Sequence, residues 1–185
     1  MKIPNLELRA GLIPLLLSLE PIKEPWEAWQ KACHMVSSLI KLEAEGFENA
    51  FRNFLAQFPD SSQTPGDAHY QSLFQMAMLL AEAKLEMEIS AANREARLWA
   101  PDGTQFVIEI KYCPDRSLEA QKKVIGPLKD RRPKMSALAK EVIKQLDDKI
   151  YTRDYWGEDH DLYRVALVVG GRTEVLVELK KEKRN

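Results

Sequence analysis

The spacing of apolar side chains changes near residue 84, and this change constrains the fold more than any other feature of the sequence. Before it, apolar residues recur every three or four positions, which predicts amphipathic helices. The predicted helices span residues 26–42, 48–58 and 68–83. From residue 84 on, apolar and polar residues alternate in short runs, which predicts half-buried strands. The chain is therefore expected to begin with helices and to continue with a sheet.

The second part of the chain predicts five strands and one helix. The strands span residues 84–90, 94–100, 105–112, 163–169 and 173–179, and the helix spans residues 136–151. The Asp102-Gly103 pair predicts a hairpin, because Asp-Gly favours the tight turn that joins antiparallel strands. Residues 163–169 are rich in apolar side chains, which predicts a central, buried strand. This order of elements predicts an α/β (α+β) fold, with a mixed sheet flanked by helices.

A loop rich in Ser, Pro and Gly, residues 61–66, divides the chain into two predicted parts. Residues 1–60 are expected to form an N-terminal helical annex, with a first helix over residues 6–19. Residues 66–182 are expected to form the core that contains the sheet, with an insertion at about 113–137. A length of 185 residues suits one domain with such an annex.

The charge of the chain is balanced overall but not locally. The 27 Lys and Arg residues against 28 Asp and Glu residues exclude a uniformly basic nucleic-acid-binding protein. Between residues 116 and 140, however, there are eight basic residues and two acidic ones. Such a stretch can lie along a phosphate backbone, and a solvated surface is the alternative interpretation. The candidates for DNA-backbone contacts are Lys122, Lys123, Lys129, Arg131, Arg132 and Lys134.

Several classes of protein are not expected from this sequence. The longest apolar run, residues 12–19, contains a proline and is much shorter than the roughly 18 residues of a membrane-spanning helix. No signal-peptide pattern is present at the N-terminus. Two cysteines and three scattered histidines make neither a disulfide framework nor a zinc site. We therefore expect a cytoplasmic protein without a membrane anchor, and the oligomeric state stays open.

Glu109 and Lys111, at the end of the strand predicted over residues 105–112, are the first candidates for chemistry. Their spacing of two places both side chains on one face of a strand. A carboxylate there can hold a divalent metal, and a neighbouring lysine can orient or deprotonate a water. Glu-x-Lys also occurs at 82–84 and 178–180, so a solvated ion pair is the alternative interpretation of the three letters alone.

The order of elements around this motif (helix, hairpin, Glu-x-Lys, helix, buried strand) resembles the PD-(D/E)XK nuclease superfamily, which has a restriction-endonuclease-like fold. The sequence is most similar to the nuclease-type domain at the C-terminus of a family of bacterial and archaeal AAA-ATPase-like proteins. In the first part of the chain, residues 3–9 (IPNLELR) are similar to the family's PNxEVR start, residues 42–59 to its short helical segment, and residues 67–74 (DAHYQSLF) to its ExYYHSLFY helix. In the second part, residues 105–111 (QFVIEIK) are similar to its strand ending in FEFK, residues 145–151 (QLDDKIY) to its QIxxxxY helix, and residues 163–169 to its closing strand.

The resemblance implies hydrolysis of phosphodiester bonds in nucleic acid, with DNA as the expected substrate and Mg²⁺ or Mn²⁺ as cofactor. It implies that Glu109 binds the metal, that Lys111 assists the attacking water, and that Gln145 contacts phosphate or water. The alternative for Gln145 is a solvated position on its helix. Asp67 matches a helix position where the family has a glutamate that often reaches the metal. The alternative for Asp67 is a helix N-cap alone. His69 and Tyr70, which follow it, could flank the site.

One metal ligand of the family is missing from the matching position. The family's GRxD strand supplies an aspartate fifteen residues before the lysine, and Ala96 stands there. Glu95 is the nearest carboxylate, but a shift of one residue moves a side chain to the other face of a strand. Three explanations stay open: an engineered Ala96, a natural pseudonuclease, or a rearranged metal site with Asp67, Glu109 and Glu95 as donors.

Two functions therefore compete at this point, and a purely structural C-terminal domain that regulates an ATPase partner is a third option. One is a metal-dependent nuclease, impaired by Ala96, with little or no cleavage as written and with cleavage restored by Ala96→Asp. The other is a non-catalytic module that binds nucleic acid or docks on a protein. The sequence has no Gly-x-x-x-x-Gly-Lys-Ser/Thr loop, so an AAA-type ATPase is expected only as a removed part or as a partner.

Overall fold

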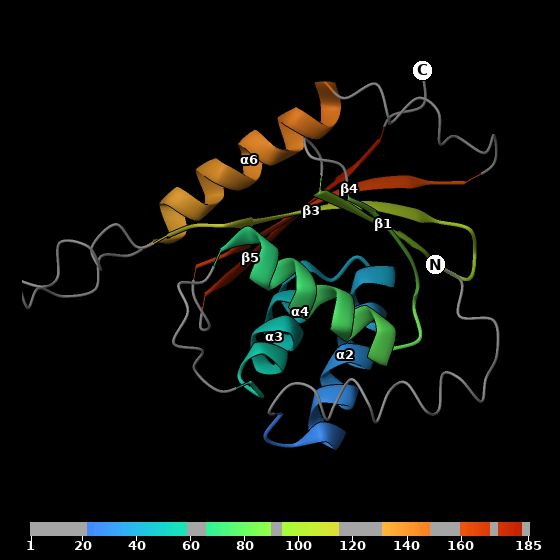
Figure 1. The fold of residues 1–185 in the computed structure, drawn as a ribbon. Helices are drawn as coiled ribbons and strands as arrows, with labels where there is room; N and C mark the ends of the chain where they lie inside the picture. Colours follow the sequence, from blue (N-terminus) through green and yellow to red (C-terminus); the bar gives the residue numbers. More distant parts are fainter. Residues whose placement is uncertain are drawn as a thin grey trace, which may run out of the picture.

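The computed structural model confirms the predicted fold class, a mixed sheet flanked by helices (Figure 1). It describes residues 22–58, 66–89, 94–114, 131–148, 160–170 and 174–182. The helices are α2 (Pro25–Ile40), α3 (Ala44–Leu55), α4 (Asp67–Leu80) and α6 (Arg132–Asp148). The strands are β1 (Lys84–Ile89), β2 (Arg94–Trp99), β3 (Gln105–Tyr112), β4 (Leu162–Val169) and β5 (Val175–Lys181).

The five strands lie in sequence order, β1-β2-β3-β4-β5. Only β3 and β4 are parallel among the described pairs, and the other neighbours are antiparallel. Parallel neighbours need a crossover connection, and α6 lies in the one between β3 and β4. Figure 1 shows α6 on one face of the sheet and α2, α3 and α4 on the other. We call these the α6 face and the annex face.

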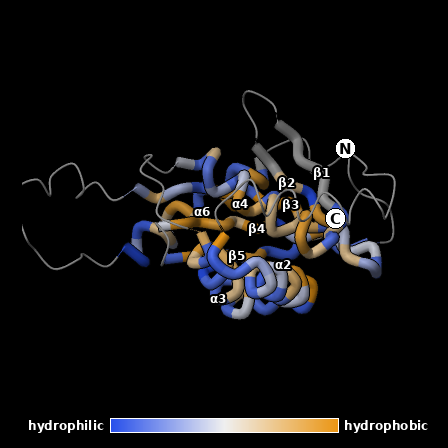
Figure 2. Tube along the Cα trace, turned by 60° about the horizontal axis from the view of Figure 1, so that its bottom comes forward, coloured by the Kyte–Doolittle hydropathy of each residue, from blue (hydrophilic) through white to orange (hydrophobic). Residues whose placement is uncertain are grey.

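Each face has its own hydrophobic cluster. On the annex face, Phe106, Ile108 and Ile110 of β3 pack with side chains of α2, α3 and α4. On the α6 face, Val107 of β3 packs with side chains of α6 and β4. Figure 2 shows the hydrophobic character of the central sheet around β4. Helices α2, α3 and α4 thus share one continuous core with the sheet. The domain boundary predicted at residues 60–66 stays a prediction.

The predicted hairpin between β2 and β3 is confirmed. The N–H of Gly103 bonds to the carbonyl of Ala100 (3.0 Å), and Gly103 has a φ of +88°, which favours glycine. The carboxylate of Asp102 accepts a hydrogen bond from the N–H of Thr104 (2.9 Å). This bond holds the pKa of Asp102 below its usual value. The Asp-Gly signal therefore predicted the place of the turn, but Gly103 has the positive φ and Asp102 does not, so the turn is not the two-residue type that the pair favours.

Two helix starts differ from the prediction. The helix expected from residue 136 begins at Arg132, so part of the predicted insertion at 113–137 is helical. Pro133 suggests a break, but proline is tolerated in the first turn of a helix, where its missing N–H would have no helical partner. The helix expected from residue 48 begins at Ala44. Position 46, in the first turn of this helix, favours glycine, because a Cβ there would come 2.8 Å from Oγ of Ser38 on α2.

Glu48, which is buried on α3, has a structural role that no local sequence pattern indicates. One carboxylate oxygen accepts a hydrogen bond from the N–H of Val177 (2.9 Å), and the other lies 3.5 Å from the guanidinium of Arg132. Val177 belongs to β5, a strand at the edge of the sheet. Satisfying the N–H groups of an edge strand blocks pairing with another chain. Glu48 thus ties α3, β5 and the start of α6 together.

Other expectations lie outside the described residues. These are the helix over residues 6–19, the PNxEVR-like segment and most of the loop at 61–66. In the part of the chain that is described, no helix has the length and apolar character needed to cross a bilayer.

Candidate active site

Glu109 and Lys111 lie side by side on the α6 face of β3, as predicted. The ammonium of Lys111 is 2.9 Å from Oε1 of Glu109. The glutamate side chain is only 6% exposed, whereas the lysine side chain is 33% exposed. Their face follows from Val107 and Cys113, which belong to the α6-side cluster. A buried carboxylate with a partly exposed ammonium beside it is the central feature of this site.

The pairing of β2 with β3 brings a second glutamate position to the same row. The register places Glu95 opposite Glu109 and Ala96 opposite Ile108. Residues directly opposite each other in an antiparallel pair share a face of the sheet. Position 95 therefore belongs to the α6 face with Glu109, and position 96 belongs to the annex face. The side chain of Glu95 is not among those the structure describes.

The assignment of Ala96 to the place of a metal ligand beside Glu109 is wrong. Ala96 is 1% exposed and packs in the annex-side cluster, away from the Glu109–Lys111 ion pair. The pairing runs without interruption from Glu95 to Trp99, so no bulge shifts the register within this stretch. The family's spacing of fifteen residues before Lys111 leads to position 96, which lies on the wrong face of the sheet. The pairing register, and not the distance along the chain, decides which side chains share a face.

Asp67 lies next to the end of β3. It is the first residue of α4, and its Oδ1 accepts a hydrogen bond from the N–H of Tyr112 (2.6 Å). The interpretation of Asp67 as an N-cap alone is wrong, because Gly66 is the N-cap. The next N–H of β3, that of Cys113, bonds to Val169 of β4. Because successive N–H groups of a strand point to opposite sides, Asp67 occupies the side of β3 that faces β2.

Two aromatic residues follow Asp67 on α4, near the same end of β3. Tyr70 stacks on Tyr112 with 5.4 Å between ring centroids, and His69 meets Tyr70 edge-on at 5.1 Å. His69 is exposed, whereas Tyr70 is buried. Both residues therefore lie near the end of β3, but Tyr70 and Tyr112 belong to the annex-side cluster, on the opposite face from Lys111. Tyr70 thus packs the start of α4 against β3 and does not flank the ion pair.

The remaining candidate residues are less closely linked to the ion pair. Gln145 is exposed on α6, and its amide donates a hydrogen bond to Glu141 (3.2 Å) one turn earlier. Its role at the phosphate stays a prediction. No group of three or more His, Cys, Asp or Glu side chains arranged to hold a metal occurs among the residues with described side chains, a set that omits Glu95.

The basic stretch is partly committed to the fold. Arg131 donates a hydrogen bond to the carbonyl of Gly170 (2.9 Å) and pairs with Glu174 (3.2 Å). Arg132 pairs with Glu48, although its side chain is 69% exposed. Lys134 is exposed at the start of α6. The other three candidates, Lys122, Lys123 and Lys129, lie outside the described residues.

Comparisons with models of protein families, with characterised proteins and with solved structures find no match to this chain. The resemblance to PD-(D/E)XK nucleases therefore stays a prediction, carried by the motifs and by the site. The site offers a buried carboxylate, a second glutamate position across the strand pair, a lysine, and Asp67 at the strand end. Oxygen donors of this kind suit a hard divalent cation.

Proposed function

We propose that this protein hydrolyses phosphodiester bonds of nucleic acid, with DNA as the substrate, in a reaction that depends on Mg²⁺ or Mn²⁺. The register that sets Glu95 opposite Glu109 is the observation that carries this proposal. Two glutamates on neighbouring strands, with Lys111 on the same face, supply the residue types that metal-assisted hydrolysis needs. The alanine at position 96 does not remove a carboxylate from this face.

The residues present are chemically suited to a divalent metal. Mg²⁺ is commonly held by one or two carboxylates together with several waters. Glu109 and Glu95 would supply the two carboxylates, and Asp67 could add an oxygen from the end of β3. A bound metal would stabilise the negative charge that develops on the phosphate. The small exposure of Glu109 favours this use, because charges attract more strongly where water is excluded.

Lys111 has a separate role in this proposal. Its ammonium lies against Glu109 but remains one-third exposed, so it can face a phosphate as well as the carboxylate. There it would orient the attacking water and balance the charge of the phosphate. Gln145 on α6 would add a contact to phosphate or water.

A non-catalytic module that binds nucleic acid or docks on a protein is the second candidate. The ion pair itself favours it, because an ammonium at 2.9 Å neutralises the carboxylate that would hold the metal. In that case the fold would be kept and the chemistry lost. A partner of the AAA-ATPase type rests on the family resemblance alone, and stays a prediction under either candidate.

Removal of the metal tests the proposed reaction. We expect the unmodified chain to cut single-stranded or plasmid DNA with Mg²⁺ or Mn²⁺, to stop when EDTA is added, and to resume when excess metal returns. Gel electrophoresis of both DNAs measures this. Cleavage that EDTA leaves unchanged would contradict a metal-dependent reaction. Binding without any cleavage of single-stranded DNA, duplex DNA or RNA would favour the second candidate.

The basic stretch is expected to contribute affinity through phosphate contacts. In the double variant Lys122→Gln/Lys123→Gln, the slope of log affinity against log salt should fall by up to about 2, since each lost duplex contact removes about 0.9. Arg131 and Arg132 are left intact because their ion pairs hold α6 to the rest of the fold. Lys31→Gln/Lys41→Gln, on α2 and at its C-cap, is the control for charge. Equal slopes in both variants would show that the stretch is a solvated surface.

A further inference from the structure

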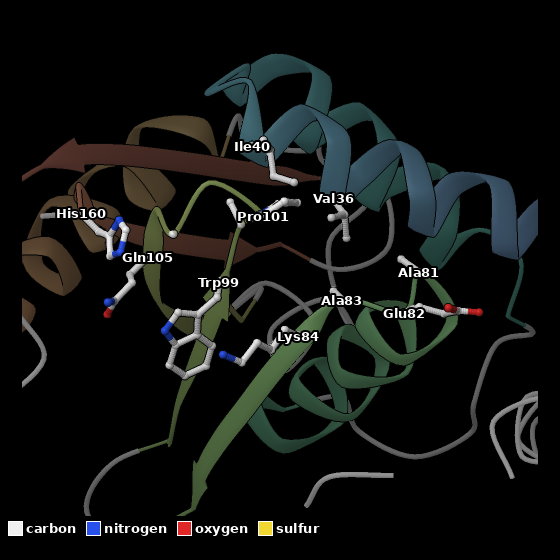
Figure 3. Close-up of a pocket in the computed structure, with 12 residues that line it drawn as sticks. Val36, Ile40, Ala81, Glu82, Ala83, Lys84, Trp99, Pro101, Gln105 and His160 are labelled. Atoms are coloured by element: carbon white, nitrogen blue, oxygen red, sulfur yellow. The ribbon is translucent and has the colours of Figure 1, made fainter. Parts of the chain in front are cut away.

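A pocket of about 720 Å³ lies at the opposite end of β3 from Lys111 (Figure 3). It opens where β1 begins, β2 ends and β3 begins. Trp99, Lys84, Gln105 and His160 supply aromatic and polar groups, and Val36 and Ile40 of α2 supply an apolar wall. No sequence pattern assigns a functional role to these residues, and Lys84 stands out only as part of a Glu-x-Lys copy.

The polar groups of the pocket gather around the indole ring. The ammonium of Lys84 is 4.9 Å from the centroid of the Trp99 ring. Figure 3 shows Lys84 on one side of Trp99 and Gln105 and His160 on the other. The carboxylate of Glu82 points away from the ring. The pocket thus combines a flat ring, a cation and hydrogen-bonding groups within one cavity.

The polar side of the pocket and the ion pair share one strand and one face, whereas Val36 and Ile40 of α2 line the pocket from the annex face. Gln105 and Glu109 lie four residues apart on β3, an even spacing that puts both on the α6 face. At a rise of about 3.3 Å per residue they are about 13 Å apart, which matches roughly four stacked nucleotides at about 3.4 Å each. In the strand register, Trp99 of β2 lies opposite Gln105 of β3, and Lys84 of β1 lies opposite Trp99. The pocket end of this face therefore extends over three strands.

We propose that this pocket binds one nucleotide of a single-stranded nucleic acid, which then runs along β3 to Glu109 and Lys111. The base would stack on Trp99 and form a hydrogen bond with Gln105 or His160. The phosphate of the same nucleotide would form an ion pair with Lys84. Unpaired bases stack on aromatic side chains and their phosphates follow cations, whereas bases inside a duplex cannot reach such a ring. This inference rests on the proposed function and names its substrate: a single strand or an unpaired end.

Binding without metal separates this inference from the proposed reaction. The full chain is titrated in EDTA into a fluorescent 16-nucleotide oligo(dT) and, separately, into a duplex of equal length, and affinity is read by anisotropy. We expect Trp99→Ala to weaken binding of the single strand about five- to a hundredfold, the effect of losing one stacked base, and to leave the duplex unchanged. Trp99→Phe, which keeps a ring, should retain most of the affinity. Lys84→Gln should weaken single-strand binding and reduce its salt dependence.

Matched controls are available on α2 and at its C-cap. Trp26 is 65% exposed and lies outside the pocket, so Trp26→Ala should change neither affinity, and Lys41→Gln is the control for Lys84→Gln. Unchanged single-strand affinity in both Trp99→Ala and Lys84→Gln would overturn the inference and leave the pocket to an apolar segment of a protein. An equal loss for the duplex would overturn it too. Single-strand binding that depends on Trp99 in a chain that cuts nothing would keep the pocket and reject the proposed reaction.

Discussion

Glu95→Gln and Glu109→Gln are each expected to lower metal-dependent cleavage at least about a hundredfold, because each removes one carboxylate charge from the metal site. A loss of that size corresponds to about 2.7 kcal/mol of transition-state stabilisation. The glutamine is nearly isosteric, so folding should be preserved. The measurement is the initial rate of cleavage of single-stranded DNA at saturating Mg²⁺, compared across the unmodified chain and the two variants.

Glu178→Gln is the matched control for these two variants. Glu178 heads another Glu-x-Lys copy, on β5, in the same row as Glu109, but Ala166 of β4 lies between the two residues, so Glu178 is not directly opposite a carboxylate. Its replacement should leave the cleavage rate within about twofold, well inside the hundredfold expected for one lost ligand. If Glu95→Gln behaved like Glu178→Gln while Glu109→Gln was inactive, position 95 would not belong to the metal site. If Glu109→Gln still cut DNA at the full rate, the site itself would be misplaced.

Ala96→Asp is expected to lower the free energy of unfolding by about 3–5 kcal/mol, the size of effect that an unpaired buried charge produces. Ala96 is 1% exposed among apolar side chains of the annex face, so an aspartate there would face hydrocarbon instead of a metal. The resemblance to PD-(D/E)XK nucleases predicts the opposite outcome for Ala96→Asp, a restored active site. Urea unfolding followed by circular dichroism measures the difference in stability.

The control for charge at this position is Ala96→Asn, which has nearly the same shape as Ala96→Asp. It should cost clearly less than the aspartate, because an amide loses less on burial than a carboxylate. An Ala96→Asp variant as stable as the chain as written, with raised cleavage, would contradict the register and return position 96 to the metal site. A destabilised variant without gain in cleavage is the result that the structure favours.

Much of the fold follows from local patterns in the sequence. Alternation defined β1, β2 and β3 to within a residue or two, and the Asp102-Gly103 turn fixed the hairpin that joins β2 to β3. The start of α6 was missed because Pro133 suggests a loop, although its place in the first turn makes it compatible with a helix. The contact of Glu48 with Val177 joins residues 129 positions apart, and no local pattern encodes it.

The site could be predicted only as far as a single strand reaches. Alternation along β3 is enough to bring Glu109 and Lys111 together, since both positions lie on one strand. The partner of Glu109 on β2 depends on the register of the hairpin, which sets residue 95 rather than 96 across from it. The bond between Asp67 and Tyr112 depends on how α4 packs on β3, and spacing within either segment does not specify it.

A crystal structure of the chain soaked in Mn²⁺ tests the central claim most directly, because the anomalous signal locates the metal without any assay of activity. The account predicts a peak between the carboxylates of Glu109 and Glu95, at coordination distances of about 2.0–2.6 Å, with Lys111 moved off Glu109 toward solvent. A peak that lacks Glu95 as a ligand, or an ion pair between Glu109 and Lys111 that stays closed with no metal bound, would contradict it.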